Sequence, residues 1–212
     1  MLGLLGGTFD PVHCGHLRMA LEARDRFGLD EVVLMPAGAP RLRDPPRADG
    51  GARLRWLRKA VDGVDGLTVD DRELHRTGPT STVDTLRELR RERPDDRLVL
   101  ILGADAFARL ARWTEWQAIP ALAHLLVVRR PGARLPRRGP VAELVAERRG
   151  DEPRLLRRRR AGLVMVADLP LLDISATRVR DLLRSGRDAR FLVPDAVLHM
   201  LISSGAYADD RN

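Results

Sequence analysis

The chain has 212 residues, and its 44% hydrophobic and 32% charged residues are typical of a globular protein with a sizeable core. This composition excludes an intrinsically disordered chain. No apolar run approaches the roughly 20 residues of a membrane-spanning helix, so that class is excluded as well. The net charge of +7 favours polyanionic partners, either nucleotides or nucleic acid, without choosing between them.

The cysteine count and the first residues bear on the compartment. A single cysteine, Cys14, cannot form an internal disulfide and suits a reducing compartment, so we predict a cytoplasmic protein. Met1–Leu5 lacks a basic region and runs directly into a glycine pair, which predicts a first strand rather than a signal peptide. We expect no membrane association. The sequence leaves the oligomeric state open, with a homodimer as one candidate.

Short leucine-rich or β-branched runs alternate with helical patterns along the chain. The predicted strands are Leu2–Leu5, Glu31–Met35, Leu67–Asp71, Arg97–Leu102, His124–Val128 and Leu163–Val166. The predicted helices are Gly15–Phe27, Arg53–Asp62, Thr80–Glu92, Asp105–Leu110, Val141–Arg148, Ser175–Ser185 and Pro194–Ser203. This alternation predicts an α/β fold with a doubly wound, mostly parallel sheet and a helical C-terminal part.

Two regions interrupt the alternation. Residues Pro36 to Gly51 are rich in Pro, Gly and Arg and predict a long loop, which is commonly functional in enzymes. A basic segment at about 129–160 contains several prolines and ends in Arg157–Arg160. We interpret that run as a solvated helix face, with nucleic-acid binding as the less favoured alternative. The prediction is one domain over residues 1–212 with a basic insertion at about 129–160.

The segment from Gly6 to His16, with the sequence GGTFDPVHCGH, joins the first predicted strand to the first predicted helix. Ligands of open parallel sheets bind at the carboxyl ends of the strands. Gly6 and Gly7 allow close backbone approach, and the helix N-terminus offers N–H groups to an anion. His13 and His16 lie three positions apart, so both can face one phosphate group. A metal site and ordinary helix caps are the less favoured alternatives. Cys14 points differently from His13 and Asp10 precedes a proline, so neither completes a zinc set.

This segment carries a resemblance to a known family. HxGH after a first strand resembles the signature of the nucleotidyltransferase superfamily that includes the class I aminoacyl-tRNA synthetases. The longer GGTFDPxHxGH is similar to the motif of bacterial nicotinate-nucleotide adenylyltransferases. The resemblance implies a Rossmann-like nucleotidyltransferase fold. It also implies roles around the ATP phosphates and the acceptor phosphate for Gly6, Gly7, Thr8, Phe9, His13 and His16.

A second motif, ISATRVR at Ile174–Arg180, stands at the start of a predicted helix. Ser175 is a plausible N-cap, Thr177 adds a hydroxyl, and Arg can bind a phosphate through two parallel hydrogen bonds. Alone, the segment favours a capped surface helix with solvated arginines; beside the first motif, phosphate binding is preferred. It resembles the family motif ISSTxIR, with Ala176 in place of the second Ser. The resemblance implies ATP binding by Ser175, Thr177 and Arg180, and a catalytic role for Arg180.

Two segments between these motifs resemble further parts of the family pattern. The run GPTSTVDTL ending at Leu86 is similar to GPSYTxDTL, with Ser81 in place of the usual Tyr. Thr80 or Ser81 is the predicted helix cap. Thr82 and Thr85 share one face of that helix, and the resemblance implies that both contact the substrate.

Asp105 and Trp113 belong to a segment similar to the family's GxD followed by Trp. The resemblance implies that Asp105 lies near ribose hydroxyls and that Trp113 stacks on the nicotinate ring. The alternative makes Trp113 and Trp116 one apolar helix face. Arg129–Gly132 resembles another family segment after the fifth strand.

One loop departs from the family pattern. Many members carry PPHK after the second strand, whereas this chain has Ala39–Arg43 and then Pro45–Pro46. Arg41 or Arg43 is a candidate for the missing positive charge, although Arg and Lys are not interchangeable.

The predicted activity is transfer of AMP from ATP to nicotinate mononucleotide, with Mg²⁺ carried by ATP and no metal site on the protein. Nicotinamide mononucleotide and phosphopantetheine remain alternative acceptors. A basic RNA-binding module is the alternative from another class. It is less favoured because stacking on bases needs aromatic residues, which make up only 4% of this chain.

Overall fold

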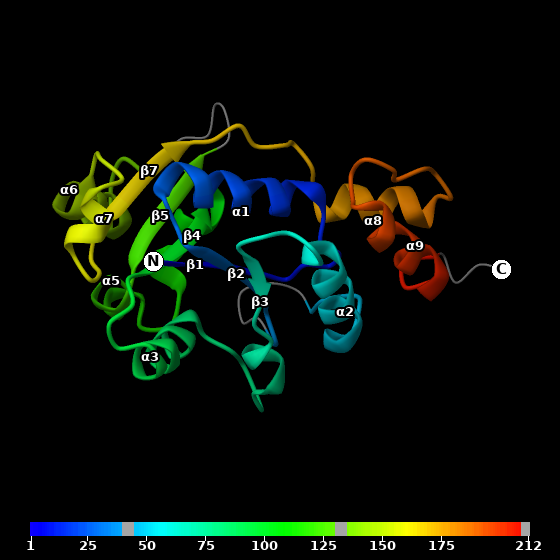
Figure 1. The fold of residues 1–212 in the computed structure, drawn as a ribbon, viewed down its shortest axis with the longest axis horizontal. Coiled ribbons are helices and arrows are strands. Elements are labelled where there is room, and N and C mark those ends of the chain that lie inside the picture. The colour runs from blue at the N-terminus through cyan, green and yellow to red at the C-terminus, as the bar shows by residue number, and fades with distance from the viewer. Residues whose placement is uncertain (40–44, 130–134, 209–212) are drawn as a thin grey trace.

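The structure is a computed structural model that describes residues 1–39, 45–129 and 135–208. Within these residues, seven parallel strands form one sheet in the order β3-β2-β1-β4-β5-β7-β6. The strands are β1 (Leu2–Gly7), β2 (Glu31–Pro36), β3 (Leu67–Val69), β4 (Leu98–Gly103), β5 (His124–Arg129), β6 (Arg149–Gly150) and β7 (Val164–Asp168). The strand order reverses its direction of growth between β1 and β4 (Figure 1).

Helices cover both faces of the sheet. They are α1 (Cys14–Phe27), α2 (Gly50–Val61), α3 (Thr82–Glu92), α4 (Ala104–Phe107), α5 (Ile119–Leu122), α6 (Pro140–Arg148), α7 (Leu155–Arg158), α8 (Ala176–Arg184) and α9 (Asp195–Ser204). Three short 3-10 helices complete the described elements: η1 (Arg72–His75), η2 (Leu110–Arg112) and η3 (Trp116–Ala118).

Two hydrophobic clusters pack against opposite faces of the sheet. In β1, Leu5 belongs to the cluster that also contains side chains of α1, α2, α7, α8 and α9. Its neighbour Leu4 belongs to the cluster formed with α3, α4, α5 and α6. Successive strand residues point to opposite faces, so strands buried on both sides need continuous apolar runs. These runs are the reason that the strands could be predicted from the sequence.

The predicted α/β fold is confirmed, although several elements differ from their predicted ranges and the short helices α5 and α7 were not predicted. Helix α2 begins at Gly50 instead of Arg53, because the Asp49 side chain caps it by accepting a hydrogen bond from the Ala52 backbone N–H at 2.9 Å. The predicted helix Asp105–Leu110 is a single turn, α4, followed by η2. The two-residue strand β6 was not predicted; it lies in the crossover between the parallel neighbours β5 and β7.

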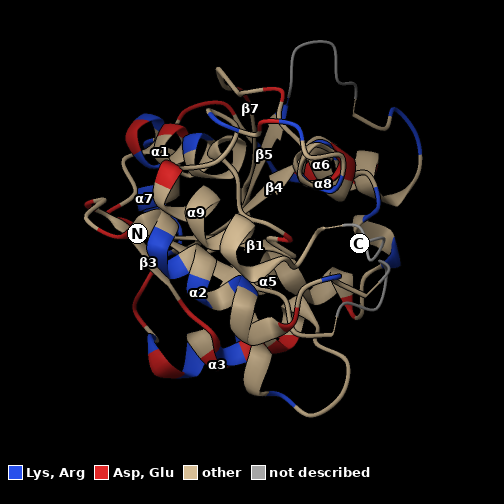
Figure 2. Ribbon diagram, turned by 90° about the vertical axis from the view of Figure 1, so that its right-hand side faces the viewer, with Lys and Arg blue, Asp and Glu red and all other residues tan. Residues whose placement is uncertain are grey.

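Charge is distributed over the outer helices. Along α3, basic and acidic residues alternate on the outer surface (Figure 2).

No helix within the described ranges is long and apolar enough to cross a membrane.

His124 is a buried histidine at the start of β5. Its Nδ1 accepts a hydrogen bond from the Leu163 backbone N–H at 3.1 Å, so the neutral ring carries its proton on Nε2 and donates to the Arg159 carbonyl at 3.0 Å. Burial lowers the pKa of His124 below its ordinary value, and the hydrogen bond to Arg159 opposes that effect. The side chain thereby connects the segment after α7 to the start of β5.

This arrangement predicts a pH dependence of stability. Because the folded pKa of His124 is lower than its unfolded value, the unfolded chain takes up the proton first as the pH falls. The stability from neutral His124 is therefore present above pH 6.5, the ordinary value, and is lost as the pH falls below it. We expect the midpoint of thermal unfolding to fall less between pH 7.5 and 5 for His124→Gln than for the unsubstituted protein. Equal pH slopes would contradict this assignment.

Candidate active site

A cleft of about 860 Å³ opens at the carboxyl ends of β1 and β4. This is the point at which the strand order reverses, where open α/β sheets bind their ligands. Thirteen residues that the sequence analysis proposed for the site line this cleft: Gly6, Gly7, Thr8, Phe9, His13, His16, Thr82, Thr85, Asp105, Trp113, Ser175, Thr177 and Arg180. Their shared location makes the predicted constellation physically possible, while their individual roles remain predictions.

The two histidines of the first motif stand at the amino end of α1. His13 is the N-cap residue in an extended conformation, and His16 is the third residue of the helix. Their rings stack with centroids 3.6 Å apart and an interplanar angle of 21°. The His13 backbone N–H donates to His16 Nδ1 at 3.3 Å, so a neutral His16 carries its ring proton on Nε2. His16 can then donate a hydrogen bond to an anion from Nε2.

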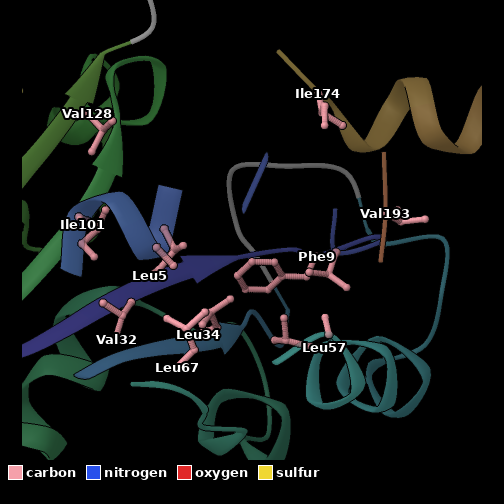
Figure 3. Close-up of a cluster of buried hydrophobic side chains, with 14 of the residues drawn as sticks. Leu5, Phe9, Val32, Leu34, Leu57, Leu67, Ile101, Val128, Ile174 and Val193 are labelled. Atoms are coloured by element: carbon pink, nitrogen blue, oxygen red, sulfur yellow. The ribbon is translucent and has the colours of Figure 1, made fainter. Parts of the chain in front are cut away.

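Phe9 packs against His16 from the hydrophobic core. It is 1% exposed and adopts a positive φ of 47°. Its ring lies in the cluster that includes Leu5 and Leu57 (Figure 3), and its edge meets the His16 ring at a centroid distance of 4.9 Å. A Cβ at Gly7 would come within 3.1 Å of the Phe9 ring, which explains the second glycine of the pair. A Cβ at Gly6 would instead meet nothing within 4 Å, so this glycine leaves open space on the cleft side of β1.

The His13 ring occupies a position that leaves little room for a side chain at Gly15, and this gives a testable prediction. A Cβ at Gly15 would lie 3.0 Å from His13 Nδ1 and 3.4 Å from the Leu172 carbonyl oxygen. Gly15→Ala should displace the His13 ring by a few tenths of an ångström and lower the catalytic rate about 10-fold. Stability should not fall, because Ala favours a helix over Gly by about 1 kcal/mol. Steady-state kinetics together with thermal unfolding test this; an unchanged rate would show that His13 does not need this position.

The amino end of α3 forms a second wall of the cleft. The Ser81 side chain caps α3 by accepting from the Asp84 backbone N–H at 3.3 Å, which confirms one of the two predicted caps. Thr82 is the first residue of the helix and lines the cleft, as does Thr85 one turn later. A helix amino end presents N–H groups and a positive dipole end, so this wall suits an anionic group.

Thr85 is already engaged inside the protein. Its hydroxyl donates to Glu73 Oε1 at 2.7 Å and accepts from Arg76 Nη1 at 2.8 Å. Arg76 also donates to Glu88 Oε2 at 2.6 Å. This network fixes the first turn of α3, so Thr85 is placed to order the wall of the cleft as well as to contact a ligand.

Glu73 also lines the cleft and was not singled out from the sequence. Burial raises the pKa of Glu73 above its ordinary value, and the Thr85 hydroxyl and the nearby Arg76 act in the opposite direction. The segment after β2 packs closely against η1, which contains Glu73. A Cβ at Gly38 would lie 2.2 Å from the Glu73 carbonyl oxygen, so only glycine allows this close approach.

The amino end of α8 forms the third wall. Ser175 is the N-cap, as predicted, and accepts from the Arg178 backbone N–H at 3.2 Å. Arg180 Nη2 donates to Thr177 Oγ1 at 3.2 Å, and its Nη1 donates to the Asp10 carbonyl oxygen at 2.6 Å. Arg180 thus joins the second motif directly to the first one.

Asp105 and Trp113 lie at the opposite end of the cleft. Asp105 is exposed in the first turn of α4, directly after β4. Trp113 follows η2 and Trp116 begins η3, and both pack against the hydrophobic cluster on the α3 face of the sheet. Of the two, Trp113 also lines the cleft, so it has a side that a ligand can reach.

Two buried charged residues that sequence reasoning missed hold the cleft together. Arg53 is 2% exposed and donates to three backbone carbonyls: Thr8 at 2.6 Å, Ala37 at 2.9 Å and Ala48 at 3.2 Å. Burial lowers the pKa of Arg53, while the nearby Asp10 carboxylate opposes that effect. Asp10 is 6% exposed, and its carboxylate accepts hydrogen bonds from the backbone N–H groups of Arg47 and Ala48. Arg53 lies in a predicted helix and Asp10 in the first motif. Arginine and aspartate are usually exposed, so the burial of these two side chains was not predicted.

Some predicted residues lie outside the described ranges. Arg41 and Arg43 of the loop after β2, and most of the segment Arg129–Gly132, fall there. Among the described residues, no group of three or more His, Cys, Asp or Glu side chains is arranged to hold a metal ion. Cys14 lies at the start of α1, and burial raises the pKa of its thiol, which makes it a weaker nucleophile.

Comparisons with known proteins agree on one family. Residues 4–182 match the model of the family described as cytidylyltransferase-like. A Marinobacter nauticus protein named "Probable nicotinate-nucleotide adenylyltransferase" is 46% identical over 205 residues, which is 96% of this chain and 95% of that protein. A protein of the same name from Halorhodospira halophila is 45% identical over 206 residues, or 97% of this chain and 94% of its own length.

Solved structures agree on the fold. The nicotinic acid mononucleotide adenylyltransferase of Plasmodium falciparum, solved in complex with NaAD, superposes with a TM-score of 0.74 over 97% of this chain and 96% of its own. Its sequence identity is only 14%, so this likeness concerns the architecture alone. The near full-length sequence matches carry the assignment further: the chain belongs to the cytidylyltransferase-like family, among the nicotinate-nucleotide adenylyltransferases.

Proposed function

We propose that the protein transfers AMP from ATP to nicotinate mononucleotide, giving deamido-NAD and pyrophosphate for NAD biosynthesis. The observation that carries this proposal is the convergence of three helix amino ends, those of α1, α3 and α8, on one cleft. The cleft also contains His13, His16 and Arg180. Such a concentration of positive potential suits two phosphate-bearing substrates that must be brought together.

The reaction is a single in-line displacement. A phosphate oxygen of nicotinate mononucleotide forms a bond to the α-phosphorus of ATP. The bond between that phosphorus and the oxygen bridging to the β-phosphate breaks, and pyrophosphate leaves with the electron pair. The attacking phosphate monoester is largely ionised at neutral pH, so no general base is required. Catalysis then consists of positioning the reactants and stabilising the charge that develops on the transferred group.

The walls formed by the amino ends of α1 and α8 make up the ATP side of the cleft. Gly6, Gly7 and Thr8 bring the backbone close to the nucleotide, and Phe9 supports His16 from the core. The paired His13 and His16 stabilise charge on the phosphates around the reacting phosphorus. Ser175, Thr177 and Arg180 bind the β and γ phosphates at the amino end of α8.

The acceptor side comprises α3 and the segment after β4. Trp113 stacks on the nicotinate ring, and Asp105 accepts hydrogen bonds from ribose hydroxyls. Thr82 and the backbone N–H groups at the amino end of α3 bind the carboxylate of the ring. Thr85 contacts the substrate and is itself fixed by Glu73 and Arg76.

A divalent metal accompanies ATP in nucleotidyltransferases of this family. We assign it as Mg²⁺, held mainly by the phosphates of ATP, because hard phosphate oxygens are the ligands that Mg²⁺ prefers. When bound, it neutralises charge on the phosphates, while the protein residues named above orient the groups that react. We also propose a cytoplasmic location, which the single cysteine supports because it suits a reducing compartment.

An acceptor comparison tests the proposal. Pyrophosphate release is measured with ATP and Mg²⁺ and, separately, nicotinate mononucleotide, nicotinamide mononucleotide or phosphopantetheine. We expect kcat/KM to be highest with nicotinate mononucleotide and the product to have the mass of deamido-NAD. A higher kcat/KM with another acceptor would keep the chemistry and reject the substrate. No turnover with any of them, combined with salt-dependent RNA binding, would favour a nucleic-acid-binding role instead.

A further inference from the structure

The C-terminal segment reaches back to the first motif through one buried hydroxyl. Tyr207, three residues beyond the end of α9, is 3% exposed. Its hydroxyl donates to Asp10 Oδ1 at 2.5 Å, across 197 positions of the sequence. Its ring packs against Trp56 of α2 with centroids 5.8 Å apart. Burial and the hydrogen bond to Asp10 raise the pKa of Tyr207, so the hydroxyl stays protonated as a donor at neutral pH.

Asp10 joins four parts of the chain. Its carboxylate accepts from the backbone N–H groups of Arg47 at 2.9 Å and Ala48 at 3.2 Å, as well as from Tyr207. Arg180 Nη1 lies 3.9 Å from its Oδ2 and donates to its carbonyl oxygen at 2.6 Å. The first motif, the segment before α2, helix α8 and the C-terminal segment therefore meet at this one residue.

The orientation of Arg180 depends on this junction. An arginine side chain has several rotatable bonds, and fixing it in one geometry costs conformational entropy. The contacts of Arg180 with Asp10 and Thr177 hold the guanidinium at the cleft before any ligand arrives. A preorganised charge stabilises a transition state better than one that must reorient during the reaction.

We infer that Tyr207 is a positioning residue for adenylyl transfer: its hydroxyl fixes Asp10, which in turn holds Arg180 at the phosphate-binding wall of the cleft. This inference rests on the proposed function. Tyr207 itself acts only through Asp10, because its hydroxyl is directed to that carboxylate and its ring to Trp56.

Tyr207→Phe tests the inference because it removes the hydroxyl and keeps the ring. We expect kcat for pyrophosphate release to fall about 10-fold, with KM for nicotinate mononucleotide changed by less than about twofold. The matched control is Leu201→Val, which loosens the same C-terminal packing in α9 without touching Asp10. It should lower the midpoint of thermal unfolding at least as much as Tyr207→Phe and leave kcat within about twofold.

A double-mutant cycle separates positioning from general loosening. If Tyr207 acts through Arg180, Tyr207→Phe should add little to the loss caused by Arg180→Lys. The kcat of the double variant should then be at most about twofold lower than that of Arg180→Lys alone. Losses that multiply would overturn the inference. So would an unchanged kcat for Tyr207→Phe, or an equal loss of kcat in Leu201→Val.

The same cycle is measured on binding of Mg-ATP in the absence of any acceptor. We expect Tyr207→Phe to weaken this binding by a few fold in the unsubstituted background and not in the Arg180→Lys background. A protein that binds ATP with this pattern but forms no dinucleotide would contradict the proposed function and leave the Tyr207 assignment standing. Equal weakening in both backgrounds would reject the Tyr207 assignment whatever the reaction.

Discussion

Replacing His13 with alanine should lower the rate of adenylyl transfer by about 100-fold or more, the scale seen when one charge-stabilising donor is removed from an active site. His13 lines the cleft at the amino end of α1, and its ring stacks on His16 at 3.6 Å. Negative charge develops on the oxygens of the transferred phosphoryl group and on the departing pyrophosphate, and donors at this wall of the cleft can stabilise it. The loss should appear in the rate constant measured under single-turnover conditions, which reports the chemical step separately from product release.

The stacked geometry adds a second expectation. Because the two rings contact each other and share one hydrogen-bonded turn, the losses of His13→Ala and His16→Ala should not multiply in the double variant. The matched control is His75→Ala, since His75 is an exposed histidine of η1 whose Nε2 lies 3.3 Å from Asp71 and which does not line the cleft. A near-normal rate for His13→Ala, or an equal loss in His75→Ala, would exclude the catalytic role.

Arg53→Met should cause the largest loss of stability among the substitutions considered. Methionine fills similar space but leaves the carbonyls of Thr8, Ala37 and Ala48 without their shared donor. Each unsatisfied buried acceptor costs about 1–3 kcal/mol, so the free energy of unfolding should fall by about 3 kcal/mol or more. Activity should fall as well, because Thr8 belongs to the turn after β1 that lines the cleft.

Urea unfolding with two comparison variants tests the Arg53 prediction. Arg53→Lys keeps the charge but loses the planar fork that reaches three acceptors, so it should recover only part of the stability. Arg58→Met removes an arginine from the same helix whose side chain is 57% exposed and bonded to Asp71, and should change stability by less than about 0.5 kcal/mol. Equal losses for Arg53→Met and Arg58→Met would mean that the three carbonyls find other partners.

The location of the cleft could be predicted because its parts follow strands. The motif after β1, the Gly103–Asp105 segment after β4 and the ISATRVR motif are far apart in the sequence. In a parallel sheet the carboxyl ends of neighbouring strands meet at one edge, so residues that follow them converge. The caps Ser81 and Ser175 were also predictable, since a hydroxyl before a helical pattern satisfies a free N–H at a known position.

The residues that hold the site in place could not be predicted in the same way. Arg53 lies on the same face of α2 as the buried Trp56 and Leu57, but arginine is usually exposed, so the sequence did not mark it as a buried donor. The Tyr207–Asp10 hydrogen bond depends on packing between two ends of the chain, which periodicity does not encode. Strand β6 was missed because two residues are too few to show any pattern.

The most direct test of the central claim follows the phosphorus atoms of ATP. The protein is incubated with nicotinate mononucleotide, Mg²⁺ and ATP that carries radioactive phosphorus at either the α or the γ position. We predict that the α label enters the dinucleotide, while the γ label is recovered entirely in pyrophosphate, in equal molar amounts. An α label that remains in ADP or AMP, or a γ label that appears on the acceptor, would contradict the assignment of this cleft to adenylyl transfer.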